Sequence, residues 1–561
     1  MTYMIDRIKH QIKTVLDNAL EKSVEKGELN IQQVPAFTIE VPREKEHGDF
    51  ATNLAMLLPR QAKMAPRQIA QILVSNMNIQ NTWIDTVEVA GPGFINFFLN
   101  DRWLLEVLPI IEDRGEDYGR VDIGRGQKIQ VEFVSANPTG PLHMGNARGA
   151  ALGDSLANLL ERAGYDVTRE FYINDAGNQI VNFGLSLEAR YLQLLGREAQ
   201  VPENGYHGED ITEHMRNLID EEGERHLQWD EEERRKYFIE YALKRNLEKI
   251  KQDLKDFGVE FDVWYSEQSL YDTGKVDSVI QYLREKGFAY EKDGAIWFKT
   301  SEFGAEKDDV LVRKNGIPTY FASDIAYHWE KFQRGFDMVI NIWGADHHGH
   351  IPRMKGAVEA LGYDPDRLHI IIMQLVRLLR NGKVVRMSKR TGKAITLRDL
   401  MDEVGVDAAR FFFNMRGADT HLEFDMDLAV KKSNENPVYY VQYAHARICS
   451  ILAQAEERGI PLPSADRANL KLLGDPSEME VLRKLADFPD EIASAAKAYE
   501  PYRLTRYVHE LASLFHTFYN SCRVISDDLD LTGARLVLVK SVRQVIRNAL
   551  EILGITAPER M

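Results

Sequence analysis

The sequence predicts an α/β fold in which a doubly wound parallel sheet forms the centre, with a small α+β module before it and an all-α segment after it. Two observations carry this prediction. The run KIQVEFVSA, a loop with Pro138 and Gly140, and a helix with Leu152, Leu156 and Leu160 follow in this order, and such a strand–loop–helix unit opens a parallel sheet. Further on, FDMVINIWGAD is a nearly continuous apolar run, which is typical of a parallel strand buried on both faces.

The length, charge and cysteine content limit the classes of protein that the chain can form. Its 561 residues suggest about three or four folding units. The net charge of −16 argues against a general polyanion binder, because non-specific nucleic-acid binding relies on excess Lys and Arg. Cys449 and Cys522 are the only cysteines, so a disulfide framework and a four-thiolate zinc site are excluded. The start of the chain is amphipathic, unlike a signal peptide, and no apolar run reaches the roughly 18 residues of a membrane span. We therefore expect a cytoplasmic protein without a membrane segment.

The chain divides into three predicted regions. Residues 1–112 combine an amphipathic helix, a second helix near Leu54 and a strand after Gly91-Pro92-Gly93, which predicts the α+β module. The charged, turn-rich stretch from Glu112 to Lys128 is interpreted as a linker. Residues 121–430 hold the parallel sheet, interrupted by an insertion over about 190–320. Residues 431–561 carry apolar side chains almost wholly at helical spacing, which predicts a helical domain.

Within the central region, local signals predict individual elements. A charged helix is predicted over 229–258, because its apolar residues recur at steps of four and three. The dipeptides Asp293-Gly294, Asn315-Gly316 and Asn381-Gly382 each separate strand-like runs, so they predict hairpin turns. Thr396 with Asp399 predicts a capping box at the start of a further helix.

A first motif, Pro141-Leu142-His143-Met144-Gly145-Asn146, lies at the strand–loop–helix junction. A helix N-terminus presents free N–H groups and a positive dipole end, which suit a phosphate. Gly145 allows close approach to the backbone, and His143 and Asn146 are three residues apart, so both can donate hydrogen bonds to one ligand. A helix cap followed by a surface histidine is an equally good interpretation of this motif alone.

A second motif, Arg386-Met387-Ser388-Lys389-Arg390-Thr391-Gly392-Lys393, follows the last predicted hairpin. Four cations in a loop that contains glycine suit a clamp on the terminal phosphates of ATP. Taken alone, such a loop is more often a solvated basic surface.

Together the two motifs, HMGN and RMSKR, resemble the signature pair of class I aminoacyl-tRNA synthetases. They occur in the expected order and about 240 residues apart. Asn146 replaces the second histidine of the first signature, and Arg386 replaces the first lysine of the second. The flanking runs VEFVSANPTGPLHMGNARGAALGD, SDIAYHWEKF, NIWGADHHGH and NPVYYVQYAHAR, with GDFATNLAM and GPGFINFFL near the N-terminus, resemble arginyl-tRNA synthetase of the bacterial type over nearly the whole chain.

The resemblance implies a fold and a reaction. The fold is a Rossmann-type catalytic domain between an N-terminal tRNA-binding module and a C-terminal anticodon-binding domain. The reaction activates L-arginine with Mg-ATP to arginyl-adenylate and transfers arginine to the 3′-terminal adenosine of tRNA, with release of AMP and pyrophosphate. The implied cofactors are ATP and Mg²⁺ without structural zinc, and the partners are tRNA, L-arginine and ATP for a monomer that contacts no membrane. The implied residues are His143, Asn146, Lys389 and Arg386 for catalysis and Gly145, Gly344, Asp346, Met387 and Ser388 for ATP.

The arginine pocket must hold a planar guanidinium with five donors, for which a carboxylate is the natural partner. By resemblance, Tyr320 and Asp324 face the substrate side chain, and their spacing of four places them on one helix face. Ser135, Asn137, Glu267 and His347 complete the implied set, although local alignment could shift Glu267 by one residue. A site built for several donors leaves acceptors unpaired when lysine enters, so no editing domain is expected.

Two further groups have alternative interpretations. Asp346, His347, His348 and His350 could form a metal cluster, but contacts to the nucleotide at a strand end fit this position better. Tyr440 and Tyr443 resemble family aromatics that meet the anticodon, and unpaired bases stack on such rings; each alone could equally be a core residue. Met561 resembles a family terminus near the same site, and Asn100 and Trp103 are weaker candidates for contact with tRNA.

Two other functions compete with this interpretation. Another class I adenylate-forming enzyme, such as a cysteine-ligating paralogue, would lack both end domains and would usually show zinc ligands. A tRNA-binding protein that descends from a synthetase would keep the fold without the chemistry. Loss of His143 or Lys389 would favour the latter, and both are present.

Overall fold

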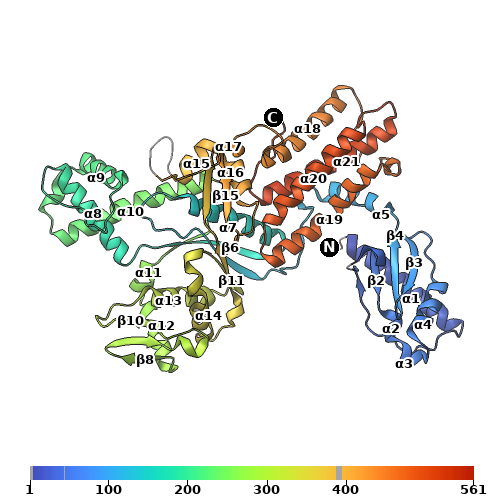
Figure 1. Cartoon of the computed structure of the whole chain (residues 1–561), viewed down its shortest axis with the longest axis horizontal. Coiled ribbons are helices and arrows are strands. Elements are labelled where there is room, and N and C mark those ends of the chain that lie inside the picture. The colour runs from blue at the N-terminus through green and yellow to red at the C-terminus, as the bar shows by residue number, and fades with distance from the viewer. Residues whose placement is uncertain (1–3, 43, 387–393) are drawn as a thin grey trace.

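The computed structural model describes residues 4–42, 44–386 and 394–561 (Figure 1). The N-terminal module, blue in Figure 1, packs helices against a four-stranded antiparallel sheet of order β1-β2-β4-β3. Ile8, Ile12 and Leu16 share one helix face and are buried against Phe97. The elements are α1 (Met4–Glu25), β1 (Ile39–Glu40), β2 (Phe50–Thr52), α2 (Leu54–Leu57), α3 (Pro59–Ala62), α4 (Pro66–Asn76), β3 (Ile84–Ala90) and β4 (Phe94–Leu99).

The stretch predicted as a linker is partly helical and packed. It follows α5 (Arg102–Leu105) and begins within α6 (Val107–Arg114). The Glu112 carboxylate pairs with Lys540 at 2.6 Å, and the hydroxyl of the buried Tyr118 donates to the Leu485 carbonyl at 2.7 Å. Both partners come from the C-terminal helices, so the connection is fastened to a domain far away in sequence.

The centre is a five-stranded sheet of order β12-β11-β5-β6-β7, and all its neighbouring strands are parallel. The chain moves outward from β5 through β6 to β7, then returns to the other side of β5 with β11 and β12. Open α/β sheets bind ligands outside the carboxyl ends of strands at such a reversal. The strands are β5 (Lys128–Glu132), β6 (Asp166–Ile173), β7 (Val263–Ser266), β11 (Met338–Gly344) and β12 (Leu368–Met373).

Three helices carry residues to this edge of the sheet. α7 (Met144–Arg162) follows β5 and packs against β5 and β6. α13 (Tyr320–Gln333) precedes β11, and α14 (Ile351–Ala360) follows it. The predicted strand FDMVINIWG corresponds to β11, whose central residues are fully buried.

Two lobes interrupt the sheet and lie on the left of Figure 1. The helical lobe has a core of its own, which contains Phe183, Met215 and Phe238. The other lobe contains the predicted hairpin at Asp293-Gly294 within a three-stranded sheet of order β10-β9-β8. Their elements are α8 (Asn178–Leu194), α9 (Glu209–Glu222), α10 (Glu231–Asp256), α11 (Gln268–Asp272), α12 (Lys275–Glu285), β8 (Ala289–Lys292), β9 (Ala295–Phe298) and β10 (Asp309–Val312).

After β12 the chain forms a small sheet of order β14-β13-β15, with a turn at Asn381-Gly382 as predicted. The predicted capping box is also present, because Thr396 accepts from the Asp399 N–H and Asp399 accepts from the Thr396 N–H. These elements are β13 (Val376–Arg380), β14 (Lys383–Val385), α15 (Leu397–Val404), α16 (Val406–Phe413), β15 (Leu422–Asp425) and α17 (Met426–Ala429).

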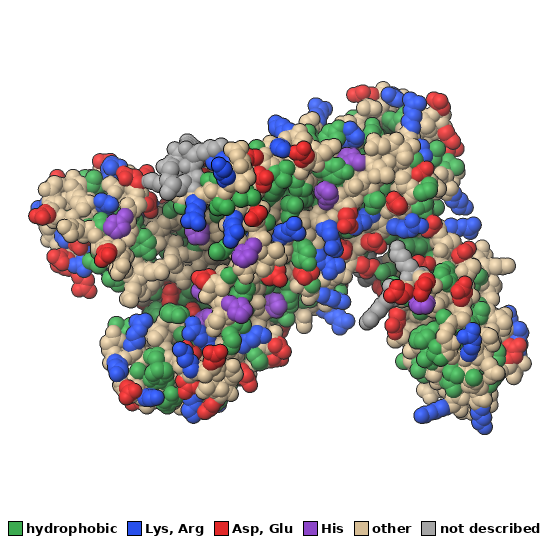
Figure 2. Space-filling model, viewed as in Figure 1, with side chains coloured by type: hydrophobic (Ala, Val, Ile, Leu, Met, Phe, Trp, Pro, Cys, Tyr) green, Lys and Arg blue, Asp and Glu red, His purple; other side chains and the backbone are tan. Residues whose placement is uncertain are grey.

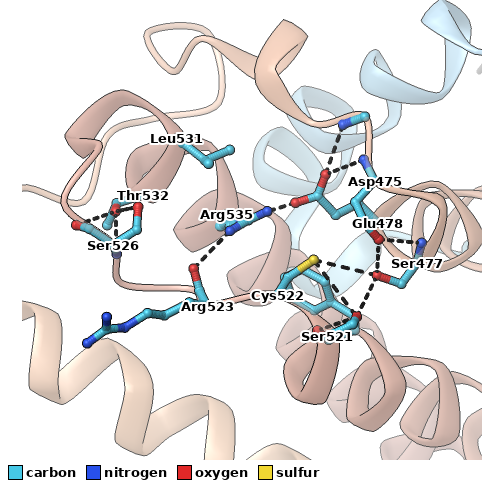
Figure 3. Close-up of polar contacts among 12 residues, drawn as sticks. Asp475, Ser477, Glu478, Ser521, Cys522, Arg523, Ser526, Leu531, Thr532 and Arg535 are labelled. Carbon is cyan, nitrogen blue, oxygen red and sulfur yellow. Dashed lines mark hydrogen bonds and ion pairs between the residues drawn. The ribbon is translucent and has the colours of Figure 1, made fainter.

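The C-terminal region is helical, with α18 (Pro437–Glu457), α19 (Pro476–Ala498), α20 (Tyr502–Ser521) and α21 (Leu529–Ile552). Figure 3 shows how polar groups fasten three of these helices. Glu478 on α19 accepts from Arg535 Nε on α21 at 2.7 Å, and Arg535 Nη1 donates to the Arg523 carbonyl beyond α20. The predicted fold class, with a parallel sheet between an N-terminal module and a C-terminal helical domain, is confirmed.

Candidate active site

A cavity of about 810 Å³ opens at the carboxyl ends of β5, β6 and β11, where the strand order reverses. Figure 2 shows histidine side chains gathered near the hollow between the central body and the left-hand lobes. The predicted residues that line the cavity are Ser135, Asn137, His143, Asn146, Asp324, Gly344, Asp346 and His347. Arg386 is exposed and is the last residue described before 394. Met387, Ser388 and Lys389 lie outside the described residues.

The first motif forms the N-terminus of α7. His143 is the N-cap, and its Nδ1 accepts a hydrogen bond from the Gly145 N–H at 3.2 Å. Asn146 Oδ1 accepts from the His143 N–H at 3.1 Å. Because Nδ1 is an acceptor, the ring proton lies on Nε2, and burial lowers the His143 pKa. The cap therefore holds a neutral imidazole whose Nε2–H can donate, so the helix-cap and ligand-donor interpretations are compatible.

The backbone joins the two motif regions. His143 and Thr396 form an isolated antiparallel bridge, and the Leu397 N–H donates to the Leu142 carbonyl at 2.9 Å. Thr396 lies ten residues after Arg386 in the chain. The segment that follows the second motif is thus held against the first one.

The loop after β5 has a strained backbone. Val134 and Ser135 have φ angles of +68° and +41°, a region that is uncommon for any residue other than glycine and rarer still for the β-branched Val134. Ser135 Oγ donates to Glu132 Oε1 at 2.8 Å, and Asn174 Nδ2 donates to the Ser135 carbonyl at 3.0 Å. Such strain persists where surrounding contacts fix it, commonly at functional sites. The cavity wall at Ser135 is therefore held in one conformation.

A buried lysine contacts the carboxylate that binds Ser135. Lys331 is fully buried on α13, and its ammonium pairs with Glu132 at 2.5 Å and donates to Asn341 Oδ1 at 2.8 Å. Glu132 thus accepts from Ser135 and Lys331 through different oxygens. A single carboxylate links α13, β5 and the strained loop.

Asp324 of α13 lines the cavity, whereas Glu267 and Tyr320 are not among the residues that line it. Asp324 and Tyr320 lie one helical turn apart, and the Ser323 hydroxyl donates to Glu267 Oε1 at 3.0 Å. Burial, with Asp324 and Asp175 nearby, raises the pKa of Glu267 to about 7, although the Ser323 bond lowers it. Acidic groups whose ionisation is resisted in this way suit a cationic ligand.

The structure assigns a contact that the sequence did not reveal. His350 is buried, and its Nε2 lies 3.0 Å from Asp324 Oδ2. The predicted His347 instead is exposed, with Nε2 3.5 Å from the exposed Asp346 carboxylate. The run of histidines in GADHHGH pointed to this segment, but the sequence alone gives no sign of which ring meets α13. Among the described residues, no group of three or more His, Cys, Asp or Glu side chains could hold a metal ion.

The tRNA candidates lie elsewhere, on the C-terminal helices. The Tyr440 ring lies 5.1 Å from the His509 ring and 4.8 Å from the His516 ring. Tyr443 stacks on Tyr439, with its ring centroid 6.1 Å away. Both predicted tyrosines are partly exposed, and no local signal in the sequence pointed to the two histidines beside them.

Met561 and the N-terminal candidates lie in other surroundings than Tyr440 and Tyr443, although Met561 shares a cavity with Tyr439, the stacking partner of Tyr443. Met561 is 53% exposed and lines a different cavity with Tyr439. Asn100 Oδ1 accepts from the Arg102 N–H, and Trp103 packs partly buried between the N-terminal and central cores. In the part of the chain that the structure describes, no helix is long and apolar enough to cross a membrane.

Three family models together match nearly the whole chain. The arginyl tRNA synthetase N-terminal domain matches residues 7–99, and the catalytic domain of tRNA synthetases class I (R) matches residues 110–432. The DALR anticodon binding domain matches residues 441–561.

Full-length relatives and solved structures agree with these matches. Arginine–tRNA ligases of Caldanaerobacter subterraneus subsp. tengcongensis and Acetivibrio thermocellus are each 60% identical, and 100% of both chains is covered in each comparison. A putative arginyl-tRNA synthetase of Campylobacter jejuni aligns with a TM-score of 0.76 at 37% identity, covering 82% of this chain and 100% of that one. Thermus thermophilus arginyl-tRNA synthetase shares the fold, with a TM-score of 0.69 at 22% identity over 98% of this chain and 100% of that one. The resemblance inferred from the two motifs is thus confirmed, and the chain belongs to the arginyl-tRNA synthetases, the class I aminoacyl-tRNA synthetases that ligate arginine to tRNA.

Proposed function

We propose that the cavity at the reversal of the sheet activates L-arginine with Mg-ATP to arginyl-adenylate and then transfers arginine to the 3′-terminal adenosine of tRNA. One observation supports this most directly: a helix N-terminus suited to phosphate and the carboxylate of Asp324 line the same cavity. Arginine carries a cation at one end and the attacking carboxylate at the other. A site for adenylate formation needs both features within the length of one amino acid.

Asp324 binds the guanidinium in this proposal, because a carboxylate accepts two parallel N–H bonds in the geometry of that group. Glu267 adds a second negative charge, and the Tyr320 hydroxyl adds a further acceptor. Ser135 and Asn137 bind the amino-acid end, and His347, which lines the same cavity, completes the arginine site. Lysine offers one compact ammonium, so it would leave acceptors of this pocket unpaired, a mismatch worth roughly 10⁴-fold or more in comparable sites.

His143 and Asn146 donate hydrogen bonds to the α-phosphate as the arginine carboxylate attacks it and pyrophosphate leaves. The neutral His143 ring is suited to this task, because its Nδ1 is occupied by the Gly145 N–H and its proton lies on Nε2. Arg386 and Lys389 neutralise the pyrophosphate, and Met387 and Ser388 lie against the nucleotide. Gly145, Gly344 and Asp346 bind the rest of ATP, which brings Mg²⁺ with it as substrate. Positioning and neutralisation of charge supply most of the catalysis in such a transfer.

Tyr440 and Tyr443 stack on anticodon bases in this proposal, and Met561 contributes from the chain end. Their partial exposure on one helix supports the assignment, since unpaired bases stack on aromatic faces at about 1–3 kcal/mol per base. We further propose that the protein acts as a monomer in the cytoplasm.

Exchange of pyrophosphate into ATP, measured with each amino acid and with or without tRNA, tests the proposal. We expect exchange with arginine and with no other amino acid, and we expect it only when tRNA is present. Exchange with another amino acid would contradict the proposed specificity, and no exchange under any condition would contradict the proposed chemistry. Asp324→Ala should raise the KM for arginine far more than the KM for ATP, whereas equal effects would remove Asp324 from the arginine pocket.

A further inference from the structure

His350 lies beside Asp324, lines the same cavity and is 6% exposed. Its two ring nitrogens have different partners. Arg353 Nε donates to Nδ1, and Nε2 lies 3.0 Å from Asp324 Oδ2. A guanidinium has only donors, so Nδ1 must accept and the ring proton lies on Nε2. The tautomer is therefore fixed by Arg353, and His350 donates its Nε2–H to the Asp324 carboxylate.

The ring of His350 is also confined by packing. It meets the Phe321 ring edge-on at 5.5 Å and the Trp343 ring at 5.4 Å between centroids. Phe321 belongs to α13 and Trp343 to β11, so two elements restrict rotation of the imidazole. A confined donor holds its acceptor at lower entropic cost than a mobile one.

Arg353 extends the same arrangement to Tyr320. Its Nη2 donates to the Tyr320 hydroxyl at 3.4 Å, and its Nη1 pairs with Asp309 at 3.1 Å. The Arg353 guanidinium also lies over the Phe321 ring at 5.0 Å. One side chain of α14 thus contacts Tyr320 directly and Asp324 through His350.

We propose that His350 and Arg353 are positioning residues of the arginine pocket, which set the orientation of the Asp324 carboxylate and of the Tyr320 hydroxyl. This inference rests on the proposed function, because it requires that Asp324 binds the substrate guanidinium. A neutral imidazole suits the position better than a cation would. It occupies one acceptor site of Asp324 and leaves the negative charge and the remaining lone pairs for the substrate. The positively charged Arg353 acts on Asp324 through His350, and Arg353 itself is paired with Asp309.

Steady-state kinetics with three variants test this inference. His350→Ala should raise the KM for arginine about 10- to 100-fold, the effect of one lost hydrogen bond to a charged group, and change the KM for ATP by less than about twofold. His350→Gln should return the KM for arginine to within about threefold of wild type, because its amide nitrogen can reach the place of Nε2. Lys355→Ala on the same helix removes only a surface pair with Asp366 and should behave as wild type.

Arg353→Met extends the test to the second positioning residue. It removes the donor that fixes the tautomer while keeping much of the side-chain volume. It should raise the KM for arginine in the same direction by about 3- to 30-fold. An unchanged KM for arginine in Arg353→Met would exclude Arg353 from the mechanism.

A double-mutant comparison separates positioning from direct contact with the substrate. If His350 acts through Asp324, then Asp324→Asn/His350→Ala should have about the same KM for arginine as Asp324→Asn alone. The inference would be overturned if the two substitutions raised the KM for arginine independently, so that their effects multiplied. It would also be overturned if His350→Gln had as high a KM for arginine as His350→Ala, or if Lys355→Ala raised this KM by the same factor. If Asp324→Asn leaves the KM for arginine unchanged, the proposed pocket itself fails. The retained KM for ATP shows in every case that the variant is folded.

Discussion

The Ser323 hydroxyl donates to Glu267 Oε1 across 3.0 Å, and so it joins the first turn of α13 to the residue that precedes α11. The bond holds Glu267 near Asp324, whose negative charge opposes ionisation of Glu267. Burial is the largest contribution to the raised Glu267 pKa of about 7. Ionisation of Glu267 is thus unfavourable in the free site, and a bound cation would make it more favourable.

Arginine binding should therefore depend on pH near neutrality. The guanidinium favours the ionised form of Glu267, and this form competes with the protonated one near neutrality because burial raises the Glu267 pKa to about 7. The KM for arginine should rise about tenfold between pH 8 and pH 6, the shift expected one pH unit below a single pKa. The KM for ATP, measured in parallel, serves as the control.

Glu267→Gln should have a higher KM for arginine at pH 8 than the wild type, with no rise toward pH 6. A wild-type KM for arginine that stays constant over this range would mean that Glu267 does not titrate in the binding step. A slope that persists in Glu267→Gln would assign the titration to another group.

The same carboxylate should reduce the stability of the free protein. The folded-state pKa of about 7 lies above the ordinary value of 4.5 for a glutamate, so the folded protein binds this proton more tightly than the unfolded chain does. The stabilisation of the folded protein by this bound proton is fully present below pH 4.5 and is lost as the pH rises through 7. Glu267→Gln should thus stabilise the free protein at pH 8 by on the order of 1–3 kcal/mol and have little effect near pH 4.5. Thermal unfolding at both pH values measures this, and an equal change at both would indicate a packing effect instead.

Local patterns were enough to predict the sheet and the first motif. The apolar run of β11 and the leucines of α7 need only their own spacing to show that they are buried. His143 and Asn146 lie three residues apart, so their mutual capping is a local property. Turns at Asp293-Gly294 and Asn381-Gly382 follow from the backbone preferences of Asn, Asp and Gly.

Contacts between distant segments could not be predicted in this way. Tyr118 reaches a carbonyl 367 residues away, which is why the expected linker proved to be packed. His350 and Asp324 are 26 residues apart on different elements, so their spacing carries no periodic signal. The Glu267 pKa likewise depends on burial by segments remote from it in sequence.

His143 should contribute to catalysis more than to binding. Its Nε2–H is proposed to meet charge that develops in the transition state, so His143→Ala should lower kcat by about 10²- to 10³-fold with small changes in either KM. Single-turnover adenylate formation measures the chemical step directly. His348 is exposed and is not among the residues that line the cavity, so His348→Ala is a matched histidine control and should stay within about twofold of wild type. A defect confined to the KM for ATP would assign His143 to ground-state binding.

The Glu478–Arg535 pair in Figure 3 should be important for the stability of the C-terminal helices. The Glu478 carboxylate is buried and also accepts from the N–H groups of Gly474 and Asp475, so removal of Arg535 leaves a buried charge without its cation. Arg535→Met should lower the free energy of unfolding by about 3–5 kcal/mol. Arg506→Ala removes an exposed pair with Glu510 on α20 and should cost less than about 1 kcal/mol. Chemical denaturation of both variants measures the difference, and equal small losses would show that backbone capping alone satisfies Glu478.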